Sequence, residues 1–241
     1  MQSLRTDTSP PNRPVALTLR EWAASTPGLD SPADWITWAQ SDGAPAFPRP
    51  SVAAMPKTPR IPMMTARRLS TGSRLALHTA LTLLDKHPGT RSLVFSSRHG
   101  EIERTVQILS AIAAGSSISP TDFTMAVHNT ASGQLTISAK LPLPASSVSA
   151  GKDSFRQALY EVSAFLAAGL GPVLHVDFET NLPEIYHPQV SPVFPAYAAA
   201  FLWDDAGTTA APDGAFSAAC SDAIPGSLAF LHAYLHNPVK N

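Results

Sequence analysis

The feature that most constrains the fold is the alternation of short apolar runs with helix-like stretches over the last two thirds of the chain. Strand-length apolar runs occur at 92–97, 172–178 and 195–203. Between them, the spacing of apolar residues predicts amphipathic helices at 101–114 and 154–168. Parallel strands need such helical crossovers. The pattern therefore predicts an α/β protein built on a mostly parallel sheet with helices on its faces.

The N-terminal part of the chain extends this pattern. Apolar and polar residues alternate over 15–22, which predicts a first strand, and a helix capped by Ser31 or Asp30 follows. Six prolines lie between positions 42 and 62. Because proline removes a backbone donor and fixes φ, we expect a loop there. A long helix is predicted within 65–86.

Composition limits the class of protein. With 241 residues, 44% hydrophobic and 15% charged, the chain is long and apolar enough to bury a sizeable core. The net charge of −1 gives no indication of nucleic-acid binding. The most apolar run, 158–174, contains Glu161 and Pro172 and is too broken to span a membrane. Since the N-terminus also lacks the apolar core of a secretion signal, we expect a cytoplasmic protein.

The domain organisation is predicted to be simple. Residues 1–14, which are rich in Ser, Thr, Asn and Pro, are expected to be disordered, and residues 15–241 to form one domain. The segment 204–241 is a tail of small residues with a possible last helix at 227–236. The single cysteine, Cys220, excludes an internal disulfide and a Cys-rich zinc site.

A strand-to-helix turn within the stretch from Ser119 to Phe155 is the first candidate for chemistry. A buried strand is predicted at 147–150, and the turn that follows it contains Lys152 and Asp153 but no cysteine. In many α/β enzymes such a turn holds a nucleophile. The helix N-terminus lowers the pKa of a cysteine placed there, and backbone N–H groups form an oxyanion hole.

A second candidate is the tetrapeptide Arg98-His99-Gly100-Glu101, which directly follows a predicted strand. It resembles the start of the histidine phosphatase motif, in which a histidine accepts the phosphoryl group and an arginine clamps it. The motif here lies far from the start of the chain, and no second catalytic histidine is recognisable. A phosphoryl hydrolase stays an alternative function.

A resemblance to a known family uses more of the chain. The segments SSRHGEIERT, SPTDFTMAVHNTASGQLTIS, SAGKDSF and PVLHVDFETNLPEIY occur in this order. Together with LREWAASTPGLDSPADW and MTARRLSTGSRLAL, they resemble the N-terminal half of β-ketoacyl synthases, in particular ketosynthase-like proteins of the aryl polyene type. The resemblance runs from about Val15 to Trp203. It implies half of a thiolase-like fold, a mixed five-stranded sheet layered with helices.

The same resemblance implies a missing nucleophile. The cysteine of an active ketosynthase corresponds to Asp153 here, and a carboxylate cannot hold an acyl chain as a thioester. Helix capping is the structural role expected for Asp153. Ketosynthases take two histidines and a lysine from a second thiolase half, which we expect this chain to lack. The resemblance therefore implies a catalytically deficient subunit, similar to chain-length factors, that needs no cofactor.

Such a subunit implies partners. We expect a heterodimer with a full-length β-ketoacyl synthase of type II fatty acid or polyketide biosynthesis, and contact with an acyl carrier protein through that complex. Thiolase-type dimers join through their third strands, here within 146–150. The residues expected at this interface and at the acyl tunnel are Ser147, Val148, Ser149, Ile108, Ile112, Asp122, Phe123 and Met125.

The remaining histidines have structural explanations. His128 is expected to make a structural hydrogen bond, and His175, on a predicted buried strand, to be a core histidine. His232 and His236 share a helical face and could bind a metal ion, but no third ligand is evident. We therefore predict no metal site.

Overall fold

The structure, a computed structural model, describes residues 17–41, 46–48, 54–205 and 223–236. Five strands form one sheet in the order β1-β5-β4-β2-β3. They are β1 (Leu17–Ser25), β2 (Ser92–Ser96), β3 (Ala145–Val148), β4 (Val173–Glu179) and β5 (Tyr197–Asp205). β4, β2 and β3 are parallel neighbours, whereas β5 runs antiparallel to both β4 and β1. The mixed five-stranded sheet is confirmed: four strands point in one direction and β5 alone among them is reversed, so two of the four neighbouring pairs are antiparallel.

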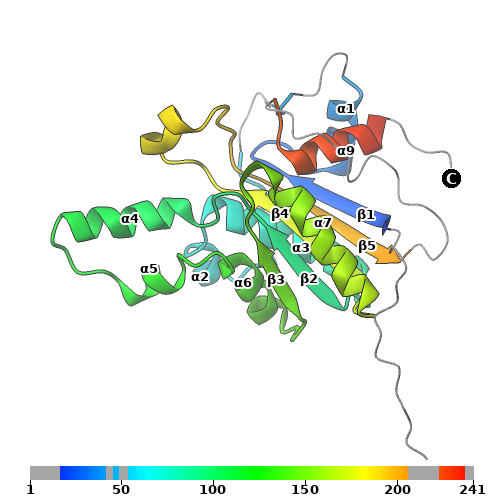
Figure 1. Ribbon diagram of the computed structural model, residues 1–241, viewed down its shortest axis with the longest axis horizontal. Helices are drawn as coiled ribbons and strands as arrows, with labels where there is room; N and C mark the ends of the chain where they lie inside the picture. Colours follow the sequence, from blue (N-terminus) through cyan, green and yellow to red (C-terminus); the bar gives the residue numbers. More distant parts are fainter. Residues whose placement is uncertain (1–16, 42–45, 49–53, 206–222, 237–241) are drawn as a thin grey trace, which may run out of the picture.

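Helices cover both faces of the sheet (Figure 1). One face packs against α1 (Pro32–Ala39), α7 (Ser154–Ala167) and α9 (Gly226–His236). The other packs against α3 (Thr71–Lys86) and α6 (Thr130–Ala139). Adjacent residues on a strand therefore enter different cores, as Val173 and Leu174 do. This double burial explains why the central strands are continuous apolar runs.

The helix α7 shows how the sequence builds the first of these cores. Its predicted apolar face is buried as expected and consists of Phe155, Leu159, Val162 and Leu166. The possible last helix is also confirmed as α9, whose Leu228 and Phe230 join the same core. The segment after β5 thus contributes cover to the helix layer that contains α7.

The predicted helix within 65–86 is two helices, α2 (Met63–Ala66) and α3. The break occurs because Ser70 adopts an extended backbone and its hydroxyl accepts a hydrogen bond from the Ser73 N–H, which caps α3. Within its first turn, at Gly72, α3 approaches the end of β4 very closely. A Cβ atom on Gly72 would lie 2.6 Å from the Glu179 carbonyl oxygen, so this contact requires glycine.

The strand predicted at 147–150 is wrong in position and burial. β3 ends at Val148 and is half-exposed, because it is an edge strand with β2 as its one neighbour among the described strands. The chain then passes through the one-turn helix η1 (Gly151–Asp153) into α7. Gly151 has a φ of +61°, a conformation that favours glycine in this sharp turn.

Residues 102–124 form an arm that extends away from the sheet in Figure 1. The arm contains α4 (Ile102–Ala113) and α5 (Pro120–Thr124), and no residue of either helix is buried. The helix η2 (Glu184–Gln189) lies in the connection between β4 and β5. None of the described helices has the length and apolar character needed to cross a bilayer.

The loop predicted over 42–62 is described at 46–48 and 54–62, where it contains no helix or strand. The predicted disordered segment 1–14 lies outside the described residues. So does the part of the tail between 206 and 222, including Cys220.

Candidate functional site

The turn between β3 and α7, where the sequence predicts the counterpart of a ketosynthase nucleophile, is stabilised by hydrogen bonds of the Ser154 side chain. The Ser154 hydroxyl accepts a hydrogen bond from the Ala150 N–H at 3.0 Å and donates one to the Gly151 carbonyl at 2.8 Å. Asp153 occupies the position that precedes α7, but its side chain makes no capping hydrogen bond to the helix. Its carboxylate instead lies 3.0 Å from the Arg156 guanidinium. Asp153 therefore occupies the expected capping position without the expected bond.

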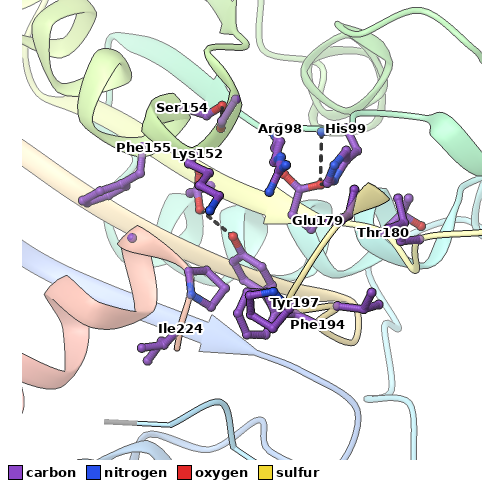
Figure 2. Close-up of a pocket in the computed structure, with 18 of the residues that line it drawn as sticks. Arg98, His99, Lys152, Ser154, Phe155, Glu179, Thr180, Phe194, Tyr197 and Ile224 are labelled. Atoms are coloured by element: carbon purple, nitrogen blue, oxygen red, sulfur yellow. Dashed lines mark hydrogen bonds and ion pairs between the residues drawn. The ribbon is translucent and has the colours of Figure 1, made fainter. Parts of the chain in front are cut away.

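A pocket with a cavity volume of about 90 Å³ opens beside this turn. Figure 2 shows Arg98, His99 and Lys152 on one side of it, with Phe194 and Ile224 on the other. These residues come from the loops after β2 and β3, from the segment before β5 and from the segment just before α9. The pocket thus lies at the carboxyl ends of the parallel strands, where α/β sheets commonly place ligands.

The floor of the pocket is a buried carboxylate. Asp177 of β4 accepts hydrogen bonds from the hydroxyls of Ser96 (2.5 Å), Tyr197 (3.0 Å) and Ser227 (2.6 Å). Burial raises the pKa of Asp177 to about 6, although the three donors act against this shift. Ser96 belongs to β2, Tyr197 to β5 and Ser227 to α9. The Asp177 carboxylate therefore joins three elements that are distant in sequence to its own strand.

His175, two residues before Asp177, is a core histidine, as expected. Its Nε2 atom lies 2.9 Å from the Ser96 hydroxyl, and its ring stacks on Phe155. The Nδ1 atom has no hydrogen-bond partner in the described structure. Burial lowers the pKa of His175 to about 3, so this imidazole is neutral at physiological pH.

The Arg98-His99-Gly100-Glu101 segment is organised by another residue of β4, Glu179. This carboxylate accepts hydrogen bonds from the backbone N–H groups of Arg98 and His99 and lies 3.1 Å from the His99 Nδ1 atom. The nearby Glu101 is buried and accepts hydrogen bonds from the hydroxyls of Ser70 and Ser73. This environment gives His99 a structural role in shaping the loop.

The predicted tunnel residues lie on the arm and next to it, away from the pocket. Phe123 and Ile112 are 65% and 55% exposed, and Ile108 is half-buried. Asp122 forms an ion pair with Arg104 that fastens α5 to α4. Met125, by contrast, is only 7% exposed and belongs to the core beneath α3 and α6.

The three residues predicted at the interface lie on or directly after the edge strand. The Ser147 hydroxyl lies 3.2 Å from that of Ser132 on α6, and the Ser149 hydroxyl donates to the Arg98 carbonyl at 3.3 Å. Val148 packs against the core of α7. These contacts connect the edge of the sheet with the loop that lines the pocket.

The other histidines form local contacts. His128 makes the expected structural hydrogen bond, from Nε2 to the Ser97 carbonyl at 3.1 Å. His232 and His236 stack on each other, with ring centroids 5.7 Å apart. Within the described part of the chain, no three His, Cys, Asp or Glu side chains are grouped so that they could hold a metal ion.

Sequence reasoning missed the acidic residues of β4 and their partners. Asp177 and Glu179 follow each other at strand spacing in an otherwise apolar run, and a carboxylate inside such a run is itself a signal of a buried polar contact. Tyr197 and Ser227 carried no comparable signal, because their partner lies 20 and 50 residues away in the sequence.

Comparisons with known proteins agree with this geometry. The family model described as beta-ketoacyl synthase, N-terminal domain, matches residues 35–238. A solved structure of the ketosynthase ApeO in complex with its chain length factor ApeC, from Xenorhabdus doucetiae, contains a chain 40% identical to this one. The TM-score is 0.79, and the match covers 92% of both chains. A search of curated proteins found no match.

Two more distant structures share the fold. The ishigamide ketosynthase/chain length factor is 18% identical with a TM-score of 0.63, over 82% of this chain and 64% of that one. A beta-ketoacyl synthase from Burkholderia phymatum STM815 is 13% identical with a TM-score of 0.61, over 79% of this chain and 59% of that one. The histidine phosphatase alternative finds no support in these matches.

Proposed function

Because the chain belongs to the β-ketoacyl synthase N-terminal domain family, we propose that it is a chain-length-factor-like subunit that pairs with a full-length β-ketoacyl synthase. The observation that carries the proposal is the 40% identity, over 92% of both chains, to a chain of a ketosynthase–chain length factor complex. The proposed setting is type II fatty acid or polyketide biosynthesis of an aryl polyene-like kind, in the cytoplasm. An acyl carrier protein would be met through the complex.

The turn before α7 supports a role without acyl transfer. In this family the corresponding turn presents a cysteine at a helix N-terminus, whereas Asp153 stands here and pairs with Arg156. A carboxylate has no thiol and therefore cannot form the thioester that a condensing enzyme requires. The proposed subunit therefore contributes shape and surface to the complex.

The edge of the sheet supplies a surface for the partner. The Val148 carbonyl accepts from the Ser97 N–H at 3.2 Å, and the Pro144 carbonyl accepts from the Leu93 N–H at 2.9 Å. Alternate residues of a strand direct their backbone groups to opposite sides, so Val148 faces β2 and Ser147 faces outward. An outward-facing row of backbone groups with small side chains is suited to antiparallel pairing with another strand.

The arm supplies a second surface. Its exposed apolar side chains include Leu109, Ile112 and Phe123. Large apolar side chains exposed together on one short arm are a feature of interaction sites. In the proposed complex, Ile108, Ile112, Asp122 and Phe123 line the partner's acyl tunnel, and Met125 supports them from the core.

The proposal is tested by co-expression with candidate ketosynthases. We expect the wild-type chain to co-purify in a defined ratio, measured by native mass spectrometry. Ser147→Pro removes an outward N–H and should abolish co-purification, because proline cannot donate to the intermolecular ladder. Ser147→Ala keeps that N–H and is the matched control.

The position of the proline decides whether the experiment tests the interface or the fold of the subunit. Val148→Pro would break the ladder with β2 and damage the subunit itself, so it cannot isolate the interface. A folded Ser147→Pro subunit, checked by circular dichroism, that still co-purifies at the wild-type ratio would show that β3 is not the contact.

A further inference from the structure

The pocket beside Asp153 has two chemically different sides. Arg98, His99 and Lys152 form a polar side, and Phe194 and Ile224 form an apolar one (Figure 2). Val193, the neighbour of Phe194 in the sequence, also lines the pocket. The apolar side is built into the protein, because Phe194 stacks on Phe47 with ring centroids 5.4 Å apart. A pocket with these two sides fits a small amphipathic molecule.

The acidic groups of the pocket are already engaged by donors of the protein itself. Glu179 accepts from the backbone of Arg98 and His99, and Asp177 accepts from three hydroxyls. Among the described residues, the Arg98 guanidinium forms no hydrogen bond or ion pair. A cation beside satisfied carboxylates leaves the pocket with donors for a negatively charged group.

Two helices add to this preference. The pocket is lined by residues at the start of α7 and at the start of α9, which are 14 and 11 residues long. Their N-terminal ends carry partial positive charge and favour an anion. The carboxylates of Asp177 and Glu179 nevertheless lie close by, and they would repel a dianion more strongly than a monoanion.

We propose that this pocket binds a small carboxylic acid, with its carboxylate on Arg98 and its hydrocarbon body against Val193 and Phe194. The planar guanidinium matches a carboxylate with two parallel hydrogen bonds. The apolar side takes a short alkyl or aryl body. The ligand is held without covalent chemistry, by residues other than those proposed to contact the ketosynthase on β3 and the arm.

The test measures binding of hexanoate to the purified full chain by isothermal titration calorimetry. Hexanamide, which has the same body without the charge, is compared with it. We expect saturable binding of hexanoate that weakens by about tenfold in Arg98→Met, the size typical of losing a charge-assisted pair. Arg91→Met is the matched control, because Arg91 is exposed at the opposite end of β2, and it should bind like the wild type.

A second variant covers the case in which Arg98→Met does not fold. Val193→Asp changes an exposed residue of the apolar side, so the fold should persist while hexanoate binding falls. The proposal is overturned if the wild type shows no saturable binding, or if hexanamide binds as well as hexanoate. It is also overturned if both variants keep wild-type affinity, or if inorganic phosphate displaces hexanoate at equal concentration.

Discussion

The arm and the centre of the sheet differ most in how far their side chains are buried. The arm has two helices without a single buried residue, and Leu109, Ile112 and Phe123 on its surface are exposed. The centre of the sheet buries aromatic side chains such as Trp203 together with the ionisable Asp177. Burial supplies the stability of a fold. We infer that the sheet with its two helix layers stabilises the subunit, and that the arm is shaped by what it contacts outside.

The largest expected effect is the loss of stability when a leucine of the core is truncated, compared with the same truncation on the arm. Leu159→Ala on α7 removes a fully buried side chain and should lower the free energy of unfolding by about 2–5 kcal/mol. Leu109→Ala removes the same atoms from an exposed position and should cost under about 0.5 kcal/mol. Urea unfolding of both variants measures the difference. Similar losses in the two would mean that the arm is part of the cooperative core.

A smaller effect is expected from the buried carboxylate, as a change with pH. The pKa of Asp177 is raised to about 6 in the folded state, against an ordinary value of 3.8. Between these values the folded protein binds a proton that the unfolded chain does not, so this group stabilises the fold as the pH falls from 6 to 4. Asp177→Asn loses that contribution. On acidification the unfolding free energy of the wild type should therefore rise relative to that of the variant, by at most about 1.4 kcal/mol per pH unit.

Comparing the wild type with Asp177→Asn separates the pH dependence that comes from Asp177 from the opposite pH dependence that comes from His175. The pKa of His175 is lowered to about 3, so this histidine alone destabilises the fold as the pH falls below its ordinary value of 6.5. Both proteins contain His175, and its contribution cancels in the difference. Urea unfolding at pH 4, 5, 6 and 7 supplies the measurement. A difference that is constant over this range would mean that Asp177 is ionised throughout.

The smallest expected effect on stability comes with the largest expected effect on product. Phe123→Ala on the arm should change the unfolding free energy by less than about 0.5 kcal/mol, because the side chain is largely exposed. With the proposed role of Phe123 in the tunnel wall, the variant in a reconstituted complex should open space there and shift the products to longer chains. Mass spectrometry of the products measures the shift.

Met125→Ala provides the contrast for that experiment. Met125 is buried, so its truncation should cost about 2–5 kcal/mol and reduce the amount of folded subunit. An intact Phe123→Ala complex with unchanged product lengths would remove Phe123 from the tunnel wall.

The sequence was sufficient to predict an element whose own residues show a clear apolar periodicity. The stripe of Phe155, Leu159, Val162 and Leu166 indicated α7 and its buried face, and the family resemblance implied the mixed sheet. It was insufficient at a local break and where distant segments meet. The serine cap at Ser70 divided one predicted helix, and the edge position of β3 depends on the order of all five strands. The pocket depends on Glu179, which lies about 80 residues from the loop it organises.

The short connection between β3 and η1 has a thermodynamic consequence. Only Ser149 and Ala150 separate the strand edge from Gly151, which lines the pocket. A partner strand on β3 and a ligand beside Lys152 would therefore hold the same few residues of backbone. Two binding events that share a segment have a common coupling free energy, and this energy acts equally in both directions. Any preference of the ketosynthase for the ligand-bound subunit must then equal the ligand's preference for the assembled pair.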